Sequence, residues 1–169
     1  MADGRRDTSL RGMSAHVWIA GPHEAEVVTR LMLGFRDHLG QDWPSENAFL
    51  AGVEKLLEDV QTDFLLGAKD ADSPPQGVCQ LRFRHGLWRA GLDCLLEDLY
   101  VEEAARGIGL GRALVGAARE RALERGARRM ELDVNEGNPA ARALYGSFGF
   151  ETKNTGGHDL YLRVHLPHE

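Results

Sequence analysis

The apolar stretch from Leu95 to Val101, with the glycine-rich segment after it, constrains the fold of this chain more than any other feature. Two carboxylates, Glu97 and Asp98, stand in its middle, and glycines follow at positions 107, 109 and 111. Glycines let the backbone curl so that successive N–H groups face one anion, and the start of a helix adds to the same positive pole. The stretch therefore predicts a strand, an anion-binding loop and a helix, in that order.

Two common phosphate-binding motifs do not fit this segment. The dinucleotide fingerprint G-x-G-x-x-G fails, because position 112 is arginine and position 114 is leucine where the third glycine would have to stand. The sequence also lacks the G-x-x-x-x-G-K-[ST] loop. Both nucleotide-binding interpretations are excluded, and the motif that remains is R-x-x-G-x-G, from Arg106 to Gly111.

This motif resembles the loop that binds the pyrophosphate of acetyl-CoA in the GCN5-related N-acetyltransferase (GNAT) family. A second segment, Asn138 to Phe150, resembles the family's N-x-x-A-x-x-L-Y-x-x-x-G-F pattern, with each specified position filled. The two motifs stand in the family's order, and the resemblance extends from Val17 to Leu166. It implies an acyltransferase that moves an acetyl group from acetyl-CoA to a primary amine by direct attack in a ternary complex.

The resemblance also implies roles for single residues. The loop would bind the pyrophosphate, and the backbone of the preceding strand would pair with the pantetheine arm. Tyr145 would donate a proton to the departing sulfur; the alternative is an aromatic side chain that only packs in the core. Asn138 would contact the pantetheine arm, although N-capping of a helix alone would explain an asparagine there. The implied cofactor-binding positions are Leu99, Tyr100, Val101, Arg106, Gly107, Ile108, Gly109, Leu110, Gly111, Arg112, Asn138 and Tyr145.

Acetyl transfer to an amine also needs a base, because an alkyl ammonium of pKa ~10 is protonated at neutral pH. A carboxylate in an apolar strand is costly unless it is paired or used. Glu97 and Asp98 are adjacent, so regular alternation predicts that they point to opposite faces of the sheet. The run L-E-D-hydrophobic-aromatic-V resembles polyamine-acetylating members of the family, where this Glu is the proposed base. We therefore take Glu97 as the base. The alternatives are that Glu97 has only a structural role, and that Asp98 or a chain of water molecules is the base.

The turn between the first two predicted helices holds candidates for acceptor binding. Asp37 and Trp43 could hold an ammonium group by charge and by cation-π contact, together with Glu97. An exposed polar turn is the alternative interpretation. We expect a small-molecule amine as acceptor; a protein or peptide acceptor and a non-catalytic acyl-CoA-binding regulatory module are the alternatives.

Hydrophobic periodicity predicts an α/β fold, with helices after Pro22, Pro44, Gly109 and Asn138. The resemblance implies the acyl-CoA N-acyltransferase fold, a mixed, mostly antiparallel central sheet with splayed middle strands and flanking helices. We expect residues 1–14 to be a disordered tail and residues 15–167 to be one N-acetyltransferase domain. The predicted strands are His16–Ala20, Phe64–Ala68, Gly77–Arg84, Leu95–Val101, Met130–Val134 and Leu160–Leu166.

The amino-acid composition limits the kinds of partner that this chain can bind. A net charge of -6 argues against nucleic acid, which needs a basic surface. No apolar run is long enough for a membrane span or a signal peptide, so we expect a cytoplasmic protein that does not bind membranes. The seven histidines have no metal-ligand spacing, and Cys79 and Cys94 are expected to be buried free thiols, although a disulfide between them is conceivable. A homodimer stays open, since members of the family often dimerise through their sheets.

Overall fold

The computed structural model of the chain describes residues 14–152 and 162–166. Its residues fall into two compact units, Met1–Asp133 and Val134–Glu169. The predicted tail, residues 1–14, lies outside the described residues except for Ser14, and so do the first two residues of the predicted last strand. One domain over residues 15–167 stays a prediction.

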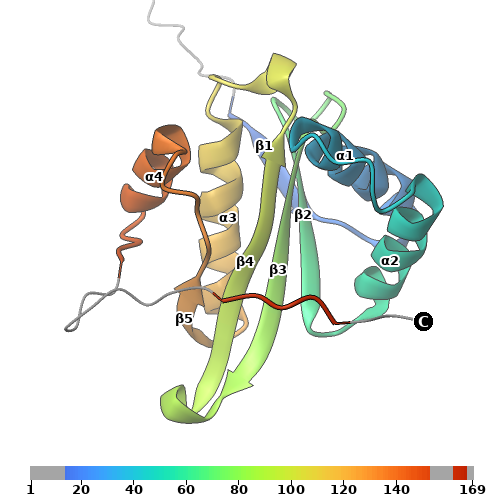
Figure 1. Cartoon of the computed structure of the whole chain (residues 1–169). Coiled ribbons are helices and arrows are strands. Elements are labelled where there is room, and N and C mark those ends of the chain that lie inside the picture. Colours follow the sequence, from blue (N-terminus) through green and yellow to red (C-terminus); the bar gives the residue numbers. More distant parts are fainter. Residues whose placement is uncertain (1–13, 153–161, 167–169) are drawn as a thin grey trace, which may run out of the picture. The chain divides into compact units, whose positions relative to one another are not determined.

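The first unit is built on a five-stranded sheet in which the strands follow each other in chain order. Pairing is antiparallel from the first strand to the fourth and parallel between the fourth and the fifth (Figure 1). The predicted mixed, mostly antiparallel sheet is therefore confirmed. The strands are β1 (His16–Ile19), β2 (Thr62–Ala68), β3 (Gly77–Gly86), β4 (Gly91–Val101) and β5 (Ala127–Glu131).

Helices cover both faces of this sheet. Helices α1 (Ala25–His38) and α2 (Glu46–Glu58) lie on one face and α3 (Leu110–Glu124) lies on the other (Figure 1). Ser45 caps α2 as predicted, because its hydroxyl accepts a hydrogen bond of 3.3 Å from the backbone N–H of Ala48. The described part of this unit also contains three short 3-10 turns: η1 (Pro22–Glu24), η2 (Leu87–Arg89) and η3 (Glu103–Ala105).

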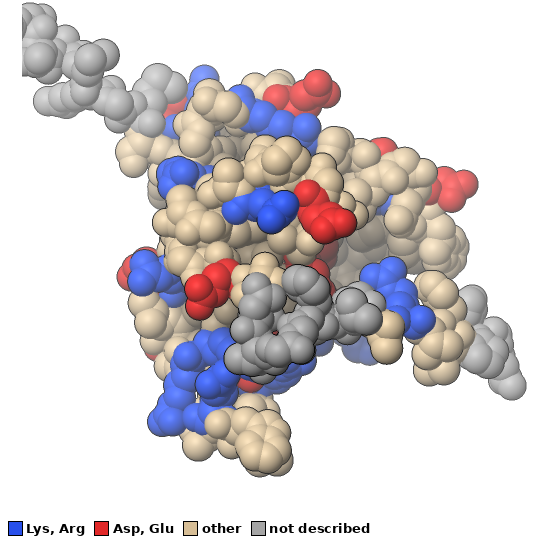
Figure 2. Space-filling model, turned by 60° about the vertical axis from the view of Figure 1, so that its left-hand side comes forward, with Lys and Arg blue, Asp and Glu red and all other residues tan. Residues whose placement is uncertain are grey.

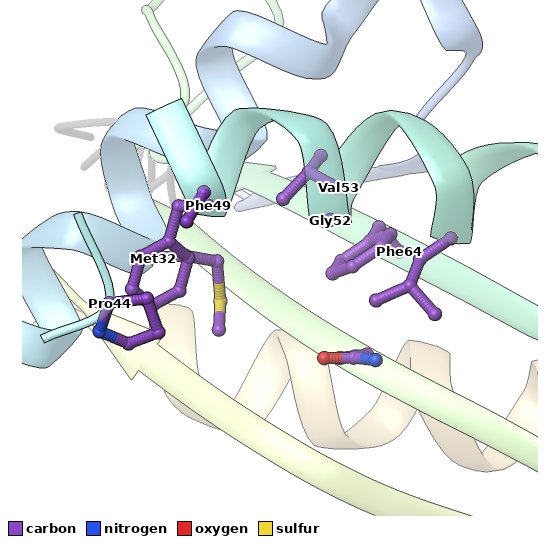
Figure 3. A pocket seen from close by; sticks show the side chains of 9 residues that line it. Met32, Pro44, Phe49, Gly52, Val53 and Phe64 are labelled. Carbon is purple, nitrogen blue, oxygen red and sulfur yellow. The ribbon is translucent and has the colours of Figure 1, made fainter. Parts of the chain in front are cut away.

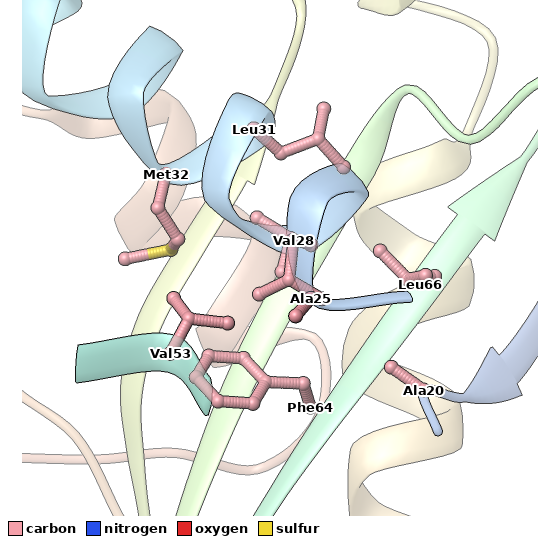
Figure 4. Close-up of a cluster of buried hydrophobic side chains, with 9 residues drawn as sticks. Ala20, Ala25, Val28, Leu31, Met32, Val53, Phe64 and Leu66 are labelled. Atoms are coloured by element: carbon pink, nitrogen blue, oxygen red, sulfur yellow. The ribbon is translucent and has the colours of Figure 1, made fainter. Parts of the chain in front are cut away.

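An apolar cluster joins α1 and α2 to the sheet. Val28 and Leu31 of α1 and Leu66 of β2 are fully buried in it, and Phe64 lies at the end nearest α2 (Figure 4). Burying each such side chain stabilises the fold by about 1.5–3 kcal/mol. The cluster consists of Ala20, Ala25, Val28, Leu31, Met32, Val53, Phe64, Leu66 and Val78.

Close packing holds α3 against the other face. A Cβ atom at Gly67 of β2 would lie 2.9 Å from Leu110, and one at Gly77 of β3 would lie 2.8 Å from Leu114. The absence of side chains at these two positions lets the start of α3 approach the strands. At the far end of the helix, Asp63 pairs with two arginines, Arg121 at 2.7 Å and Arg125 at 3.3 Å.

Pairing between β4 and β5 stops early, as the predicted splay requires. The last pair is Leu95 with Glu131, whereas β4 continues to Val101. The predicted strand Met130–Val134 is therefore wrong in its bounds: β5 begins at Ala127, and from Leu132 onward no strand partner holds the chain extended. The backbone groups of β4 that face away from β3 are left for other partners beyond Leu95.

The second unit contains α4 (Pro139–Gly146), which begins where the sequence predicts. The side chain of Asn138 caps it by accepting a hydrogen bond of 3.1 Å from the N–H of Ala141. The described part of the predicted last strand, residues 162–166, is exposed and belongs to no strand, so that prediction is wrong there. Its alternating apolar residues are not paired with any described strand, and alternation alone does not form a strand.

Candidate active site

The glycine-rich loop after β4 has the geometry of an anion cradle. Gly107 and Gly109 adopt φ values of +80° and +85°, which side chains of L residues rarely adopt. Gly109 is also the N-cap of α3, and a Cβ atom at either glycine would meet nothing within 4 Å. The N–H groups of residues 107–111 form no backbone–backbone hydrogen bond with the described turns and loops. Open space beside unused N–H groups at a helix start fits a phosphate group.

The Arg106 side chain folds back toward the end of β4. Its Nε donates a 3.0 Å hydrogen bond to the carbonyl of Val101, and its guanidinium lies 5.9 Å from the centre of the Tyr100 ring. These contacts hold a positive charge between the cradle and the part of β4 that β5 leaves unpaired. Of the predicted cofactor positions in the first unit, residues 106–109 and Arg112 are exposed, whereas the side chain of Leu110 is buried and packs against Gly67.

A β-bulge interrupts the pairing of β3 and β4 at Glu97. Gln80 lies opposite Asp98, whereas the next residue of β3, Leu81, lies opposite Leu96, so Glu97 is the extra residue. An extra residue breaks the alternation of side chains, bends the strand and increases its twist. The predicted opposite orientation of Glu97 and Asp98 is therefore wrong.

Contacts assign both carboxylates to the face that α1 and α2 cover. Glu97 accepts a 3.2 Å hydrogen bond from the side-chain amide of Gln80, which lines a pocket under α2. Asp98 is the cross-strand partner of Gln80, and such partners share a face. Tyr100, two residues further along β4, stacks on Phe35 of α1 with ring centroids 5.5 Å apart.

The two carboxylates have different surroundings. Glu97 has a side chain that is 41% exposed and lies 3.6 Å from the guanidinium of Arg82 on β3. Asp98 is half-buried, and burial together with the negative charge of Glu97 raises its pKa from 3.8 to about 6. Glu97, whose charge acts on Asp98, is paired with Arg82, and on α1 the His38 ring lies near the Tyr100 ring, with centroids 6.3 Å apart. A carboxyl group with a pKa of about 6 is mostly ionised at neutral pH.

An apolar pocket of about 220 Å³ adjoins this pair, between α1, α2 and the sheet (Figure 3). Met32, Phe49 and Phe64 point into it, and Val53 and Gly52 line it from α2. Gln80 is the one polar side chain among the described residues that line it. The pocket therefore combines apolar walls with a floor that is hydrogen-bonded to Glu97.

The two candidates from the turn after α1 do not gather at this pocket. Asp37 forms an ion pair with Arg36 at 2.6 Å and lines a different hollow, between the outer sides of α1 and α2. Trp43 is 69% exposed, although its neighbour Pro44 does line the pocket. Their part in acceptor binding stays a prediction.

Tyr145 and Asn138 belong to the second unit. Tyr145 is 9% exposed, and its ring meets Phe150 edge-on with centroids 5.9 Å apart. Asn138 caps α4 with its side chain. Both contacts match the structural alternatives considered for these residues, and the predicted roles toward acetyl-CoA stay predictions.

Arginines gather at the lower end of the face in Figure 2, the end at which Figure 1 has the hairpin of β3 and β4. On β3 and β5, two arginines pair with acids of neighbouring strands: Arg129 lies 2.9 Å from the buried Asp93 and 3.3 Å from Glu131, and Arg84 also contacts Glu131. These ion pairs tie β3, β4 and β5 together near the tip of the hairpin.

The remaining sequence predictions concern thiols, metals and membranes. Cys79 and Cys94 are free and buried, and burial raises the pKa of both thiols, that of Cys94 to about 12. Within residues 14–152 and 162–166, no group of three or more His, Cys, Asp or Glu side chains could hold a metal ion. In the same residues, no helix is both long enough and apolar enough to cross a membrane.

Comparison with known proteins gives the family. The model of the acetyltransferase (GNAT) family matches residues 28–150, which include the cradle, the bulge and α4. The chain belongs to this family. The predicted family and fold are thereby confirmed.

Named relatives of this GNAT chain acetylate different amines. The thialysine N-epsilon-acetyltransferase of Bos taurus is 33% identical to this chain over a matched region. That region makes up 47% of this chain and about half (49%) of the bovine enzyme. Glucosamine 6-phosphate N-acetyltransferase 1 of Oryza sativa subsp. japonica is 31% identical over a region that makes up 88% of this chain and 90% of the rice enzyme. A crystal structure from Arthrobacter sp. FB24, named provisionally as an acetyltransferase, superimposes with a TM-score of 0.79 and 28% sequence identity. The superposition covers 89% of this chain and 96% of the Arthrobacter chain.

Sequence reasoning missed two residues of the pocket. Gln80 is a buried amide between Cys79 and Leu81, and the cost of burying a polar group could have marked it. Gly52 is a glycine in the middle of a helix, where it weakens the helix unless space is needed. Both signals were visible in the sequence, but neither says which side chains they meet.

Proposed function

We propose that this chain is an acetyl-CoA-dependent N-acetyltransferase that acetylates a small primary amine. The observation that supports it best is that β4 carries both parts of the required site. The carboxylate pair stands at its bulge, and its end leads directly into the anion cradle. Family membership supports the same reaction class.

The cradle fits the diphosphate of acetyl-CoA, which supplies the activated acetyl group as a thioester. The N–H groups at the start of α3 and the glycine loop receive the negative charge, and Arg106 adds a full positive charge. The unpaired backbone of β4 beyond Leu95 offers hydrogen-bonding groups to the amide-containing arm. A backbone N–H of this segment is suited to stabilise the charge that develops on the carbonyl oxygen.

The carboxylate pair prepares the amine. An alkyl ammonium must lose one proton before its nitrogen can attack, and Asp98, with a pKa of about 6, is ionised and basic at neutral pH. Glu97, the base favoured from the sequence, is held by Gln80 and Arg82 and is suited to attract the ammonium. The ammonium first gives one proton to Asp98, which passes it to the solvent. The neutral nitrogen then attacks, the new C–N bond forms as the C–S bond breaks, and Asp98 takes the second proton of the nitrogen. Tyr145, in the role that the family resemblance implies, gives its proton to the departing thiolate and regains one from the solvent.

The test is release of free CoA thiol from acetyl-CoA with a panel of amines: alkylamines and arylalkylamines, polyamines, amino acids, aminoglycosides and short peptides. The buried thiols of the protein do not compete for the reagent. Turnover with a small amine supports the proposal. Turnover restricted to peptides, or acetyl-CoA binding without turnover, would support a peptide acceptor or a binding module instead. A cytoplasmic location and a homodimer remain expectations beside this proposal.

A further inference from the structure

The pocket under α2 contains a glycine that packing does not explain. Gly52 lies in the interior of α2 and lines the pocket, and a Cβ atom there would meet nothing within 4 Å. Glycine in a helix interior is less stable than alanine, since it loses more conformational freedom on folding. No close neighbour requires glycine at this position, so what it provides is space in the pocket.

The size and lining of the pocket select what can enter it. Its volume is about 220 Å³, and a cavity of roughly 150 Å³ with apolar walls is enough to bind benzene. A six-membered ring with a short alkyl chain therefore fits. Hydroxyl or ammonium groups would lose their hydration against Met32, Phe49 and Phe64 without finding partners.

The polar end of the pocket leads to the carboxylates. Gln80 lines the pocket and donates to Glu97, and Asp98 lies opposite Gln80 on the same face. A molecule whose apolar body fills the pocket could thus hold an ammonium group beside two negative charges. Arg82 lies 3.6 Å from Glu97 and balances one of the two negative charges.

We infer that the acceptor is a primary amine on a compact apolar body, an arylalkylamine or a branched alkylamine, and that the pocket at Gly52 selects it. This inference rests on the proposed acetyl transfer and adds the substrate class. It separates this chain from enzymes for polycationic or polyhydroxylated acceptors, whose polar groups the walls of this pocket cannot bind.

The first experiment compares kcat/KM for 2-phenylethylamine and isopentylamine with that for ethylamine, spermidine and an aminoglycoside. Each buried methylene is worth about fourfold in binding, so 2-phenylethylamine should exceed ethylamine by at least tenfold. A preference for spermidine or the aminoglycoside would overturn the inference and leave acetyl transfer intact. No thiol release with any of the amines would overturn both.

The second experiment fills the pocket with Gly52→Leu. The value of kcat/KM for 2-phenylethylamine should fall at least tenfold, whereas the value for ethylamine should stay within about twofold, since ethylamine does not need the space. Ala51→Leu is the matched control, because Ala51 is the exposed neighbour on the same helix and should leave both values unchanged. Gly52→Ala should give an intermediate loss and a higher melting temperature. Equal losses for both amines in a Gly52→Leu protein with an unchanged melting temperature would contradict selection by this pocket.

Discussion

Replacing Asp98 with asparagine should stabilise the protein at alkaline pH while reducing its activity. The pKa of Asp98 rises from 3.8 to about 6 on folding, mainly through burial. A raised pKa means that folding favours the protonated carboxyl, so this contribution to stability is complete below pH 3.8 and is lost as the pH rises through 6. At pH 8 the ionised group costs on the order of 3 kcal/mol, since each pKa unit corresponds to about 1.4 kcal/mol. Asparagine keeps the shape and does not ionise.

Thermal unfolding of both proteins at pH 4.5 and at pH 8 measures this effect. At pH 4.5 most unfolded chains have already lost this proton, so the cost is about 1 kcal/mol there, roughly 2 kcal/mol less than at pH 8. The stability gained by Asp98→Asn should therefore be larger at pH 8 than at pH 4.5 by roughly 4–8 °C, because 1 kcal/mol shifts the melting temperature of a chain of this size by about 2–4 °C. A stability difference that is the same at both pH values would refute the assigned burial of the charge.

The same variant tests the chemistry. Asp98→Asn should lower kcat/KM by about 10²- to 10⁴-fold, the usual contribution of a positioned base. Glu97→Gln is the matched control. It removes the negative charge that helps to raise the pKa of Asp98, so the acidic limb of the pH–rate profile should move to lower pH while turnover persists. An acidic limb that disappears in Glu97→Gln and survives in Asp98→Asn would identify Glu97 as the base.

Three further predictions concern the cradle, the last helix and the thiols. Gly109→Val should raise the dissociation constant of acetyl-CoA at least tenfold in calorimetry, because a β-branched residue does not tolerate φ near +85°, whereas Gly146→Ala should not. Tyr145→Phe should lower kcat at least tenfold with acetyl-CoA affinity nearly unchanged, because the ring and its contact with Phe150 are kept; full activity would remove Tyr145 as the proton donor. Cys79 and Cys94 should react with a thiol reagent only after unfolding, and rapid modification of the native protein would contradict their burial.

The sequence predicted the parts of the fold that depend on local chemistry. Ser45 and Asn138 cap helices as expected, because an N-cap needs a short polar side chain at one position. The bounds of β5 were missed because a strand ends where its partner does, and Glu131 is the last residue with a partner on β4. Leu162–Leu166 alternate as a strand would, but pairing is a long-range property that alternation does not encode.

The arrangement of the site was less accessible from the sequence. The cradle could be predicted, since the glycines that form it are adjacent in the chain. The relation of Glu97 to Asp98 could not, because it depends on one residue of β4 that has no counterpart on β3. The pocket was missed for a similar reason, since Met32, Gly52 and Phe64 come from three separate elements.

The bulge and the separation of β4 from β5 occur within two residues of each other. Pairing with β5 ends at Leu95, and the extra residue on β4 is Glu97. A bulge bends its strand and adds twist, and a neighbour without a matching insertion cannot follow it. A single-residue insertion would then both separate the two strands and turn two adjacent acids toward one face. Deleting Glu97 would remove the bulge between two existing pairs, Leu96 with Leu81 and Asp98 with Gln80. Every apolar side chain would then stay on its present face of the sheet. Such a deletion would keep Asp98 beside Gln80 and remove the second carboxylate, so a single codon decides whether this face of the sheet carries one acid or two.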